Sequence, residues 1–329
     1  MDGILLLEKQ KETNHYQIQS LPINSGVFCL KKDRFQDVVW IGTDGQGVYL
    51  YSNPLYSIKS MVLSNYTEKI ERPVRAIYLD DERTFWVGTK GNGILKIYDY
   101  EFDKNISDCR AEVLTTSNSA LSSNAVYCFA KSHRNLLWIG DEEGLTYYSY
   151  REKRIKSIPI RIGNEDFKYI HDIYETADSE LWLVSVGMGV VKARIAGTPD
   201  NPVIVDAQRY IINDGELGSN YFFTIYAENE ANLLFGNKGY GVFRYNETTN
   251  GLEPVSTHKY ENMTLNNILA ISKDSSNNYL FGTSYGLIKY TSETSYQLFN
   301  AKNGFLNNTI HAILMSFYNR LLLSFMHSK

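Results

Sequence analysis

The sequence of 329 residues is poor in cysteine and proline, and it has no long apolar run. Its 3 cysteines form no Cys-x-x-Cys pair, which argues against zinc-finger and thioredoxin-like chemistry. A membrane span needs about 18 consecutive apolar residues, and none is found, so we expect no membrane insertion by this chain. The net charge of −4 argues against a nucleic-acid binder, which usually needs a basic face. A short apolar run near the start has no basic segment before it, so no signal peptide is expected.

Aromatic residues and glycine are abundant by contrast. The chain has 25 Tyr, 15 Phe and 23 Gly against 7 Pro, a mixture typical of many short strands joined by glycine-bearing turns. The length alone suggests two domains, but β-propellers are an exception because they grow by adding blades. Cys29, Cys109 and Cys128 are expected to be small buried thiols.

A short phrase built around tryptophan recurs along the chain. It reads Val-Trp-Ile-Gly-Thr at its first copy and Phe-Trp-Val-Gly-Thr at its second. The tryptophan slot is occupied in turn by Trp40, Trp86, Trp138, Trp182, Leu234, Leu280 and Leu322. Successive slots lie 42 to 52 residues apart, which is the period of a propeller blade. We therefore expect the four tryptophans to be equivalent and buried, and not to be exposed platforms for sugars.

A second phrase lies 12 or 13 residues before each slot. It begins with an apolar residue, namely Val27, Val74, Val126, Ile170, Phe222, Ile268 or Ile310. Its third residue is Cys29, Ala76, Cys128, Asp172, Thr224, Ala270 or Ala312, small in five copies. Its fourth residue is apolar again. The phrase predicts an innermost strand that is buried on both faces.

A glycine follows each of the first six slots and begins the next strand. These glycines are Gly47, Gly93, Gly144, Gly189, Gly241 and Gly286. Glycine permits the positive φ of a tight hairpin turn. A fourth, looser strand completes the unit, so each blade has four antiparallel strands, A to D from the axis outward.

The two ends of the chain complement each other. The seventh copy supplies only strands A and B, whereas residues 1–19 resemble strands C and D. We expect residues 1–19 to pair with residues 310–324 in one blade that closes the ring. The prediction is an all-β fold, a single seven-bladed β-propeller over residues 1–329.

The phrases Leu-Trp-Ile-Gly-Thr, Gly-Leu-x-x-Tyr and Asn-x-Val-x-x-Ile together resemble the two-component regulator propeller repeat. Asn124, Asn220 and Asn308 stand at the asparagine of the third phrase. The resemblance implies a periplasmic sensor region of a Bacteroides-type hybrid two-component system that detects polysaccharide breakdown products. It also implies an oligosaccharide ligand, a neighbouring propeller and immunoglobulin-like domain, a homodimer, and a histidine kinase outside this chain. The chain is then expected to be a fragment of a sensor or a truncated gene product.

No catalytic, metal or cofactor site is expected from the motifs. The 6 histidines have no metal-ligand spacing. The glycine-rich turns begin strands, whereas a phosphate loop begins a helix. The acidic cluster Asp141, Glu142 and Glu143 lies in one of these turns and is interpreted as solvated.

A ligand is expected on the face where the B–C turns and the D–A connections meet, because loops differ between blades while strands stay alike. The candidate ligand-binding residues there are Arg72, Arg75, Tyr169, His171, Tyr221, Tyr240 and Tyr285. Aromatic rings cover the apolar patches of sugars, and arginine suits an acidic or sulfated sugar. The alternative for each residue is ordinary loop packing.

Three functions remain open at this point. The first is a sensor input, and the second is a protein-interaction scaffold without a small ligand. The third is a propeller enzyme such as a polysaccharide lyase or hydrolase, against which the lack of converging His, Asp and Glu residues argues.

Overall fold

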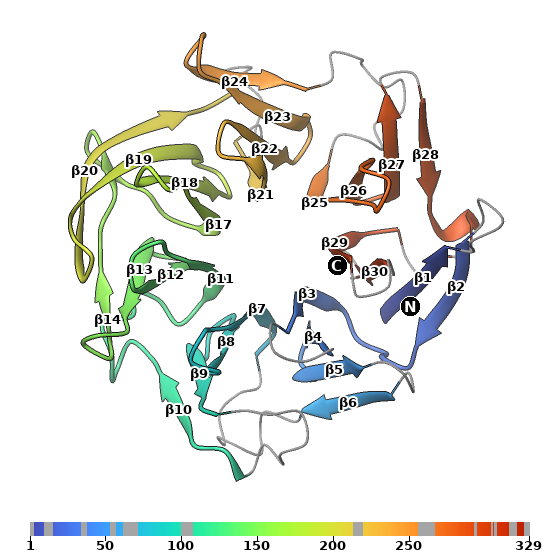
Figure 1. Ribbon diagram of the computed structural model, residues 1–329, viewed down its shortest axis with the longest axis horizontal. Coiled ribbons are helices and arrows are strands. Elements are labelled where there is room, and N and C mark those ends of the chain that lie inside the picture. Colours follow the sequence, from blue (N-terminus) through green and yellow to red (C-terminus); the bar gives the residue numbers. More distant parts are fainter. Residues whose placement is uncertain are drawn as a thin grey trace.

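Each repeat forms one four-stranded antiparallel sheet, and seven such sheets surround a central axis in the computed structural model (Figure 1). The structure describes residues 3–9, 16–33, 38–52, 57–61, 72–99, 108–212, 220–255, 267–292, 295–303, 305, 308–315 and 321–325. The prediction of a seven-bladed propeller is confirmed. In the described residues, no helix is long and apolar enough to span a bilayer.

The first four blades follow one another along the chain. Blade 1 comprises β3 (Val27–Lys32), β4 (Val38–Thr43), β5 (Val48–Ser52) and β6 (Ser57–Met61). Blade 2 comprises β7 (Val74–Leu79), β8 (Phe85–Thr89), β9 (Ile94–Ile97) and β10 (Ala111–Leu114). Blade 3 comprises β11 (Val126–Lys131), β12 (Leu136–Asp141), β13 (Leu145–Ser149) and β14 (Arg154–Ser157). Blade 4 comprises β17 (Ile170–Glu175), β18 (Glu180–Ser185), β19 (Gly189–Thr198) and β20 (Asn201–Tyr210).

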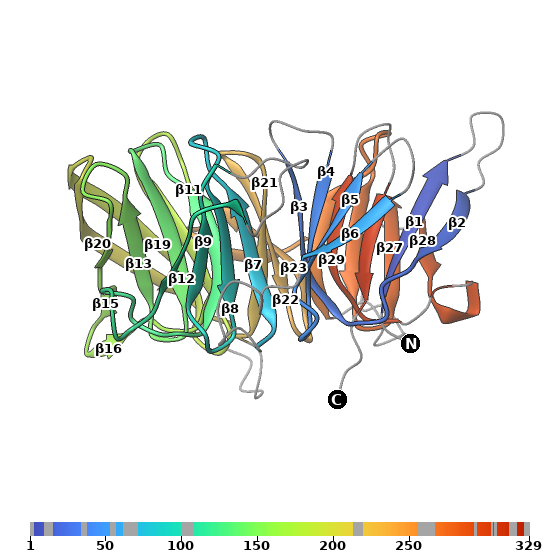
Figure 2. The same ribbon diagram turned by 90° about the horizontal axis from the view of Figure 1, so that it is seen from below.

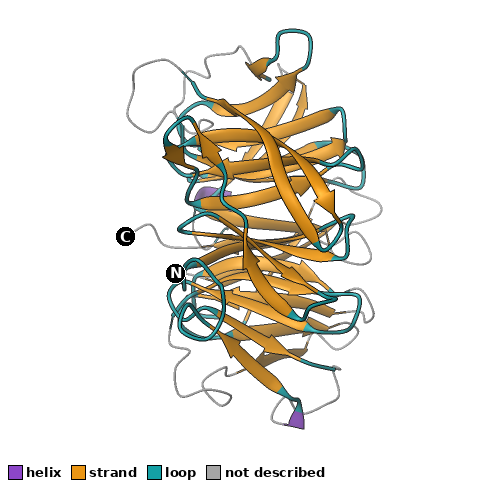
Figure 3. Cartoon of the chain, turned by 90° about the vertical axis from the view of Figure 1, so that its left-hand side faces the viewer, coloured by secondary structure: helices purple, strands orange, loops and turns teal. Residues whose placement is uncertain are grey.

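The remaining blades complete the ring. Blade 5 comprises β21 (Phe222–Asn229), β22 (Asn232–Asn237), β23 (Gly241–Asn246) and β24 (Gly251–Pro254). Blade 6 comprises β25 (Ile268–Lys273), β26 (Tyr279–Thr283), β27 (Gly286–Ser292) and β28 (Ser295–Phe299). Blade 7 comprises β29 (Ile310–Met315), β30 (Leu321–Phe325), β1 (Gly3–Lys9) and β2 (Tyr16–Leu21). Outside the blades are the short hairpin of β15 (Arg161–Ile162) and β16 (Glu165–Asp166), and the 3₁₀ turn η4 (Ala301–Asn303). Figure 3 shows how strands dominate the described chain.

Ring closure joins the two ends of the chain, as predicted. In blade 7, β1 pairs with β30 from Gly3 opposite Phe325 to Leu7 opposite Leu321. Ile4 of β1 also packs against blade 1 in a buried cluster. Closure by pairing leaves no open sheet edge between the first and last blades. Figure 2 shows β1 among the neighbouring strands from the edge of the disc.

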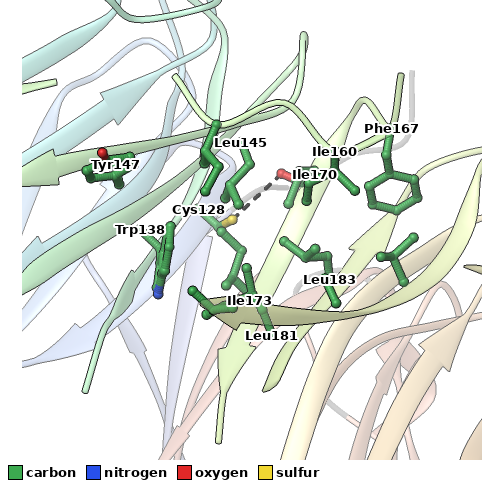
Figure 4. Packing of buried hydrophobic residues seen from close by; sticks show 14 of the residues in the cluster. Cys128, Trp138, Leu145, Tyr147, Ile160, Phe167, Ile170, Ile173, Leu181 and Leu183 are labelled. Carbon is green, nitrogen blue, oxygen red and sulfur yellow. Dashed lines mark hydrogen bonds between the residues drawn. The ribbon is translucent and has the colours of Figure 1, made fainter. Parts of the chain in front are cut away.

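Hydrophobic cores lie between adjacent blades. Figure 4 shows the core between blades 3 and 4, where Trp138 and Cys128 face Leu183 and Ile170. The Cys128 thiol donates a hydrogen bond to the carbonyl of Ile170 over 3.6 Å. A similar core joins each neighbouring pair of blades, so the stabilising apolar burial is spread around the ring.

The four tryptophans are buried and equivalent, as predicted, with exposed fractions of 0 to 2%. The Nε1 groups of Trp40 and Trp86 donate to Asp33 and Asp80 of their own blades, each over 2.9 Å. The Nε1 group of Trp138 instead donates to Glu175 of blade 4 over 2.6 Å. A polar contact therefore joins two blades inside their shared core.

Candidate functional site

A β-bulge interrupts the innermost strand of every blade. The pairing register shifts between the first and third residues of the inner phrase, for example between Val27 and Cys29 and between Val126 and Cys128. The same shift occurs in the other five blades. A bulge leaves one residue outside the ladder and redirects its side chain. In each blade that residue is the second of the phrase.

These bulge residues line a central cavity of about 340 Å³. We call them the channel belt: Phe28, Arg75, Tyr127, His171, Phe223, Leu269 and His311. They come from β3, β7, β11, β17, β21, β25 and β29, the innermost strands in Figure 1. The cavity volume lies within the range of roughly 300–1,000 Å³ that is usual for small-molecule sites.

Neighbouring belt side chains touch around much of the circle. The Arg75 guanidinium lies 3.9 Å from the centroid of the Phe28 ring. The rings of Tyr127 and His171 are stacked with centroids 4.4 Å apart. The His171 ring then meets that of Phe223 edge-on at 5.8 Å. The belt thus consists of five aromatic rings, one leucine and one guanidinium, and it is not a set of independent loop residues.

The belt histidines are neutral near pH 7. Burial, with the charges of Arg75 and Lys90, lowers the pKa of His171 to about 3. Burial and the charge of Arg75 lower the pKa of His311 to about 4. The His311 ring also meets the Phe28 ring at 6.2 Å. Burial likewise lowers the pKa of Arg75. A neutral imidazole offers one donor and one acceptor, so both rings suit a hydroxyl-rich ligand.

A second layer of mostly small residues lines the same cavity. It consists of the third residues of the phrase: Cys29, Ala76, Cys128, Asp172, Thr224, Ala270 and Ala312. The Asp172 carboxylate accepts hydrogen bonds from the N–H groups of Ile173 and Ile225 and from the Thr224 hydroxyl. Burial raises the pKa of Asp172 to about 6, although these hydrogen bonds oppose the shift. Asp172 therefore joins two blades at the wall of the channel.

The prediction of three small buried thiols is correct for Cys128 and wrong for Cys29 and Cys109. Burial raises the pKa of Cys29 to about 12 and that of Cys128 well above its ordinary value. A protonated thiol is a poor nucleophile. Cys128 is buried, whereas Cys109 and Cys29 are partly exposed.

The prediction that the inner strand is buried on both faces was wrong. β3 is buried only at its first residue, and the rest of the strand is half-buried. The fourth residues Leu30, Ile77 and Phe129 all line the cavity, and of these Ile77 is buried while Leu30 and Phe129 are half-buried. The physical reason is the channel, which leaves one face of each inner strand without a protein neighbour.

The B–C turns and D–A connections meet on one face, at the end of the channel where the belt lies. The Lys90 N–H of a B–C turn donates to the carbonyl of Pro73, and the Gly93 N–H donates to that of Asn124 in the next blade. Tyr169 lies on this face, 42% exposed, with a φ of 55°. Its N–H donates to the carbonyl of Glu142 of blade 3, and its carbonyl accepts from Val186 of blade 4. A bulky residue in the left-handed region is strained, and such strain is often stored at functional sites.

The candidate residues from the sequence fall into two groups. Arg75 and His171 line the cavity, and the charge of Arg75 acts on His171. Tyr169 is exposed on the connection two residues before His171. These three side chains belong to one end of the channel.

The other four candidates do not line the cavity. Arg72 is exposed, and its backbone N–H donates to Asn92 over 3.1 Å. Tyr221 is half-buried with Lys238 Nζ 5.6 Å from its ring centroid. Tyr240 packs on the core between blades 4 and 5, and Tyr285 is a 37% exposed turn residue. Ordinary packing describes Tyr240 better than ligand contact.

Sequence reasoning missed five of the seven belt residues: Phe28, Tyr127, Phe223, Leu269 and His311. A signal was present, because the second position of the inner phrase is bulky in every copy, between an apolar and a mostly small residue. Its meaning depends on the bulge, which a pattern of alternating burial does not reveal.

The interpretation of the acidic turn needs a correction. Asp141 is 0% exposed, so it is not solvated. Its carboxylate accepts hydrogen bonds from the N–H groups of Glu143 and Gly144 and from the Ser122 hydroxyl. Burial raises its pKa to about 6. The buried Asp141 carboxylate thus stabilises the turn through these hydrogen bonds. Across the described residues, no group of three or more His, Cys, Asp or Glu side chains could hold a metal ion.

Solved structures with the same fold include an extracellular domain of a two-component system, an enzyme and a secretion-system component. The extracellular domain of a protein described as a hybrid two-component system from B. thetaiotaomicron superposes with a TM-score of 0.66 at 20% identity. The match covers 93% of this chain and 39% of that one. Virginiamycin B lyase from Staphylococcus aureus, an inactive variant with quinupristin, gives a TM-score of 0.66 at 13% identity over 98% of this chain and all of the lyase. PorZ, a component of the type-IX secretion system of Porphyromonas gingivalis, gives 0.62 at 14% identity, covering 95% of this chain and 49% of PorZ.

These likenesses show the propeller fold. No family model matches the chain, so the resemblance to the two-component regulator propeller repeat stays a prediction. Translation initiation factor 6 from Saccharolobus solfataricus is 31% identical over 140 residues. That alignment covers 39% of this chain and 57% of the factor, so it assigns no family.

Proposed function

We propose that the chain is the ligand-binding propeller of a periplasmic two-component sensor. In this proposal it binds an oligosaccharide from polysaccharide breakdown at the belt end of its channel. The binding signal passes, through a homodimer, to a histidine kinase outside this chain. The channel belt is the observation that supports the proposal most. The chain spans 39% of the B. thetaiotaomicron domain, so the remaining domains of such a sensor are part of the proposal.

The belt suits a sugar for a physical reason. Aromatic faces cover the apolar C–H patches of a sugar ring, and neutral imidazoles exchange hydrogen bonds with its hydroxyls. The exposed ring of Tyr169 extends this surface beyond the cavity. Substitution of belt residues should therefore alter binding more than stability.

Calorimetric titration with a panel of oligosaccharides tests the proposal. We expect at least one saccharide to bind, and Tyr127→Ala to weaken that binding at least tenfold, a change of about 1.4 kcal/mol. Tyr296→Ala is the matched control, because Tyr296 is a 41% exposed tyrosine of the outer strand β28. Undiminished binding by Tyr127→Ala would place the ligand elsewhere. Failure of every saccharide would favour a protein-interaction scaffold.

A propeller enzyme is a less favoured alternative than the scaffold, because the 13% identity to virginiamycin B lyase indicates a shared fold alone. The sensor proposal expects no cleavage of polysaccharides and no opening of quinupristin by the purified chain. Mass spectrometry of the reaction mixtures measures both. A new product that forms in proportion to the amount of chain would support the enzyme instead.

A further inference from the structure

Arg75 carries a charge that no described residue neutralises by contact. Its Nε atom is buried and has no hydrogen-bond partner. No carboxylate in the described part of the chain forms an ion pair with it. Asp44, whose charge raises the pKa of Arg75, is an exposed residue of the turn between β4 and β5. Burial of an incompletely paired cation is unfavourable, so an anion in the channel would gain by contacting it.

The position of the guanidinium prepares it for such a contact. Its Cζ atom lies over the Phe28 ring, 3.9 Å from the ring centroid. A guanidinium stacked on a ring keeps its N–H groups for partners in its own plane. Those groups form a fork that fits a carboxylate or a sulfate with two parallel hydrogen bonds. The ring contact thus orients Arg75 without using its donors.

The other charged groups that line the cavity lie away from the belt or are engaged with the protein. Lys31 stands three residues beyond Phe28 along β3, about 10 Å from the belt, and its Nζ lies 5.5 Å from the centroid of the Tyr78 ring. The Asp172 carboxylate accepts hydrogen bonds from Ile225, Ile173 and Thr224. The two belt histidines are neutral, so Arg75 is the cation of the belt. A ligand anion that has entered the channel at the belt would therefore meet Arg75.

We infer that the ligand carries an oxyanion, a uronate carboxylate or a sulfate ester on a sugar ring, and that Arg75 binds it inside the channel. This inference rests on the proposed saccharide binding and adds the charge of the ligand. Arg75 then acts as a specificity residue that separates acidic from neutral saccharides of the same linkage.

Competitive calorimetry with three disaccharides of one linkage tests the inference: a neutral one, one with a uronate and one with a sulfate ester. We expect one of the two acidic disaccharides to bind the full chain at least tenfold more tightly than the neutral one. Arg75→Gln should remove this preference, and Arg75→Lys should keep part of it, since the charge remains while the fork is lost. Arg154→Gln is the matched control. Arg154 pairs with Glu152 and its side chain is 66% exposed at the start of an outer strand. Inorganic sulfate should compete with the preferred acidic disaccharide in wild type.

The outcomes separate the two claims. Equal binding of acidic and neutral disaccharides by wild type, or a preference that survives Arg75→Gln, would overturn the inference about charge. The proposed saccharide site would stand if the neutral disaccharide binds and Tyr127→Ala still weakens that binding. If no saccharide of either kind binds, both claims fail. If the melting temperature of Arg75→Lys is unchanged, a loss of preference in that variant is not caused by a folding defect.

Discussion

At the scale of single residues, Trp138 and Trp182 fill the same slot but differ in one polar contact. The Nε1 group of Trp138 donates to Glu175, which is 4% exposed and whose Oε1 atom has no hydrogen-bond partner. No described residue accepts a hydrogen bond from Trp182 Nε1. Loss of the donor at Trp138 would leave a buried carboxylate less satisfied.

We therefore predict that Trp138→Phe destabilises the protein more than Trp182→Phe. The difference should be about 1.5–3 kcal/mol, the usual contribution of one hydrogen bond to a charged group, because the His133 N–H and Arg134 still contact the Glu175 carboxylate. Chemical denaturation of both variants and wild type measures it. Equal free energies of unfolding for the two variants would show that the contact with Glu175 contributes nothing net.

Tyr169 combines backbone strain with an exposed ring at the channel mouth. Tyr169→Gly should be more stable than Tyr169→Ala by roughly 1 kcal/mol, because only glycine adopts positive φ without cost. Both variants should bind the saccharide less well than wild type, since both lose the ring. Thermal denaturation and calorimetry separate the two effects. A tighter-binding Tyr169→Gly variant would exclude the ring from the site.

At the scale of elements, the glycine of strand B sets how closely a blade approaches the next inner strand. A Cβ atom at Gly140 would lie 2.5 Å from Cys128 Sγ and 2.8 Å from the carbonyl oxygen of Ile170. Neither contact is compatible with normal packing. A Cβ atom at Gly251, in the outer strand β24, would meet nothing closer than 3.8 Å.

Gly140→Ala should thus destabilise the protein by about 1–3 kcal/mol through overpacking. Gly251→Ala should change stability by no more than roughly 0.5 kcal/mol. Denaturant titration of the two variants makes a matched comparison. A neutral Gly140→Ala variant would mean that the blades can separate slightly at no cost.

The elements also show what a sequence of this kind can predict. The roles of Trp86 and Gly93 were predictable because both positions recur in phase and each fits one steric requirement, a buried side chain or a tight turn. The pairing of the chain ends was predictable because together they complete one repeat. The position of the bulge residue Tyr127 in the channel was not predictable. A bulge changes the face of the sheet on which a side chain lies, while the residue type stays the same. The burial of Asp141 was not predictable either. Its carboxylate accepts a hydrogen bond from Ser122, which lies 19 residues earlier, in the connection between β10 and β11.

At the scale of the whole molecule, the buried histidines of the channel make stability depend on pH. The folded-state pKa values of His171 and His311, about 3 and about 4, lie below the unfolded value of 6.5. The unfolded chain then binds more protons in this window, so these groups lower stability as the pH falls below 6.5. Asp172 and Asp141, with folded pKa values of about 6 against 3.8, act in the opposite direction between pH 6 and 3.8.

We predict that His311→Gln loses less stability than wild type between pH 7 and pH 4.5. The loss of unfolding free energy should be smaller in His311→Gln by about 2 kcal/mol. Each unit of pH below the unfolded pKa costs wild type roughly 1.4 kcal/mol while the folded side chain stays neutral. Urea denaturation at the two pH values measures it. His133→Gln is the control, as His133 lies in a connection outside the channel. Equal acid losses for wild type and His311→Gln would show that His311 is protonated in the folded protein.

The central claim is that the belt end of the channel is the binding surface of the propeller. Hydrogen–deuterium exchange with and without the best saccharide from the panel tests it most directly, because bulged inner strands expose amides that a ligand would cover. The account predicts slower exchange in peptides that contain the starts of β3, β7, β11 and β17, together with Tyr169. Slower exchange confined to the A–B and C–D turns on the opposite face would contradict it.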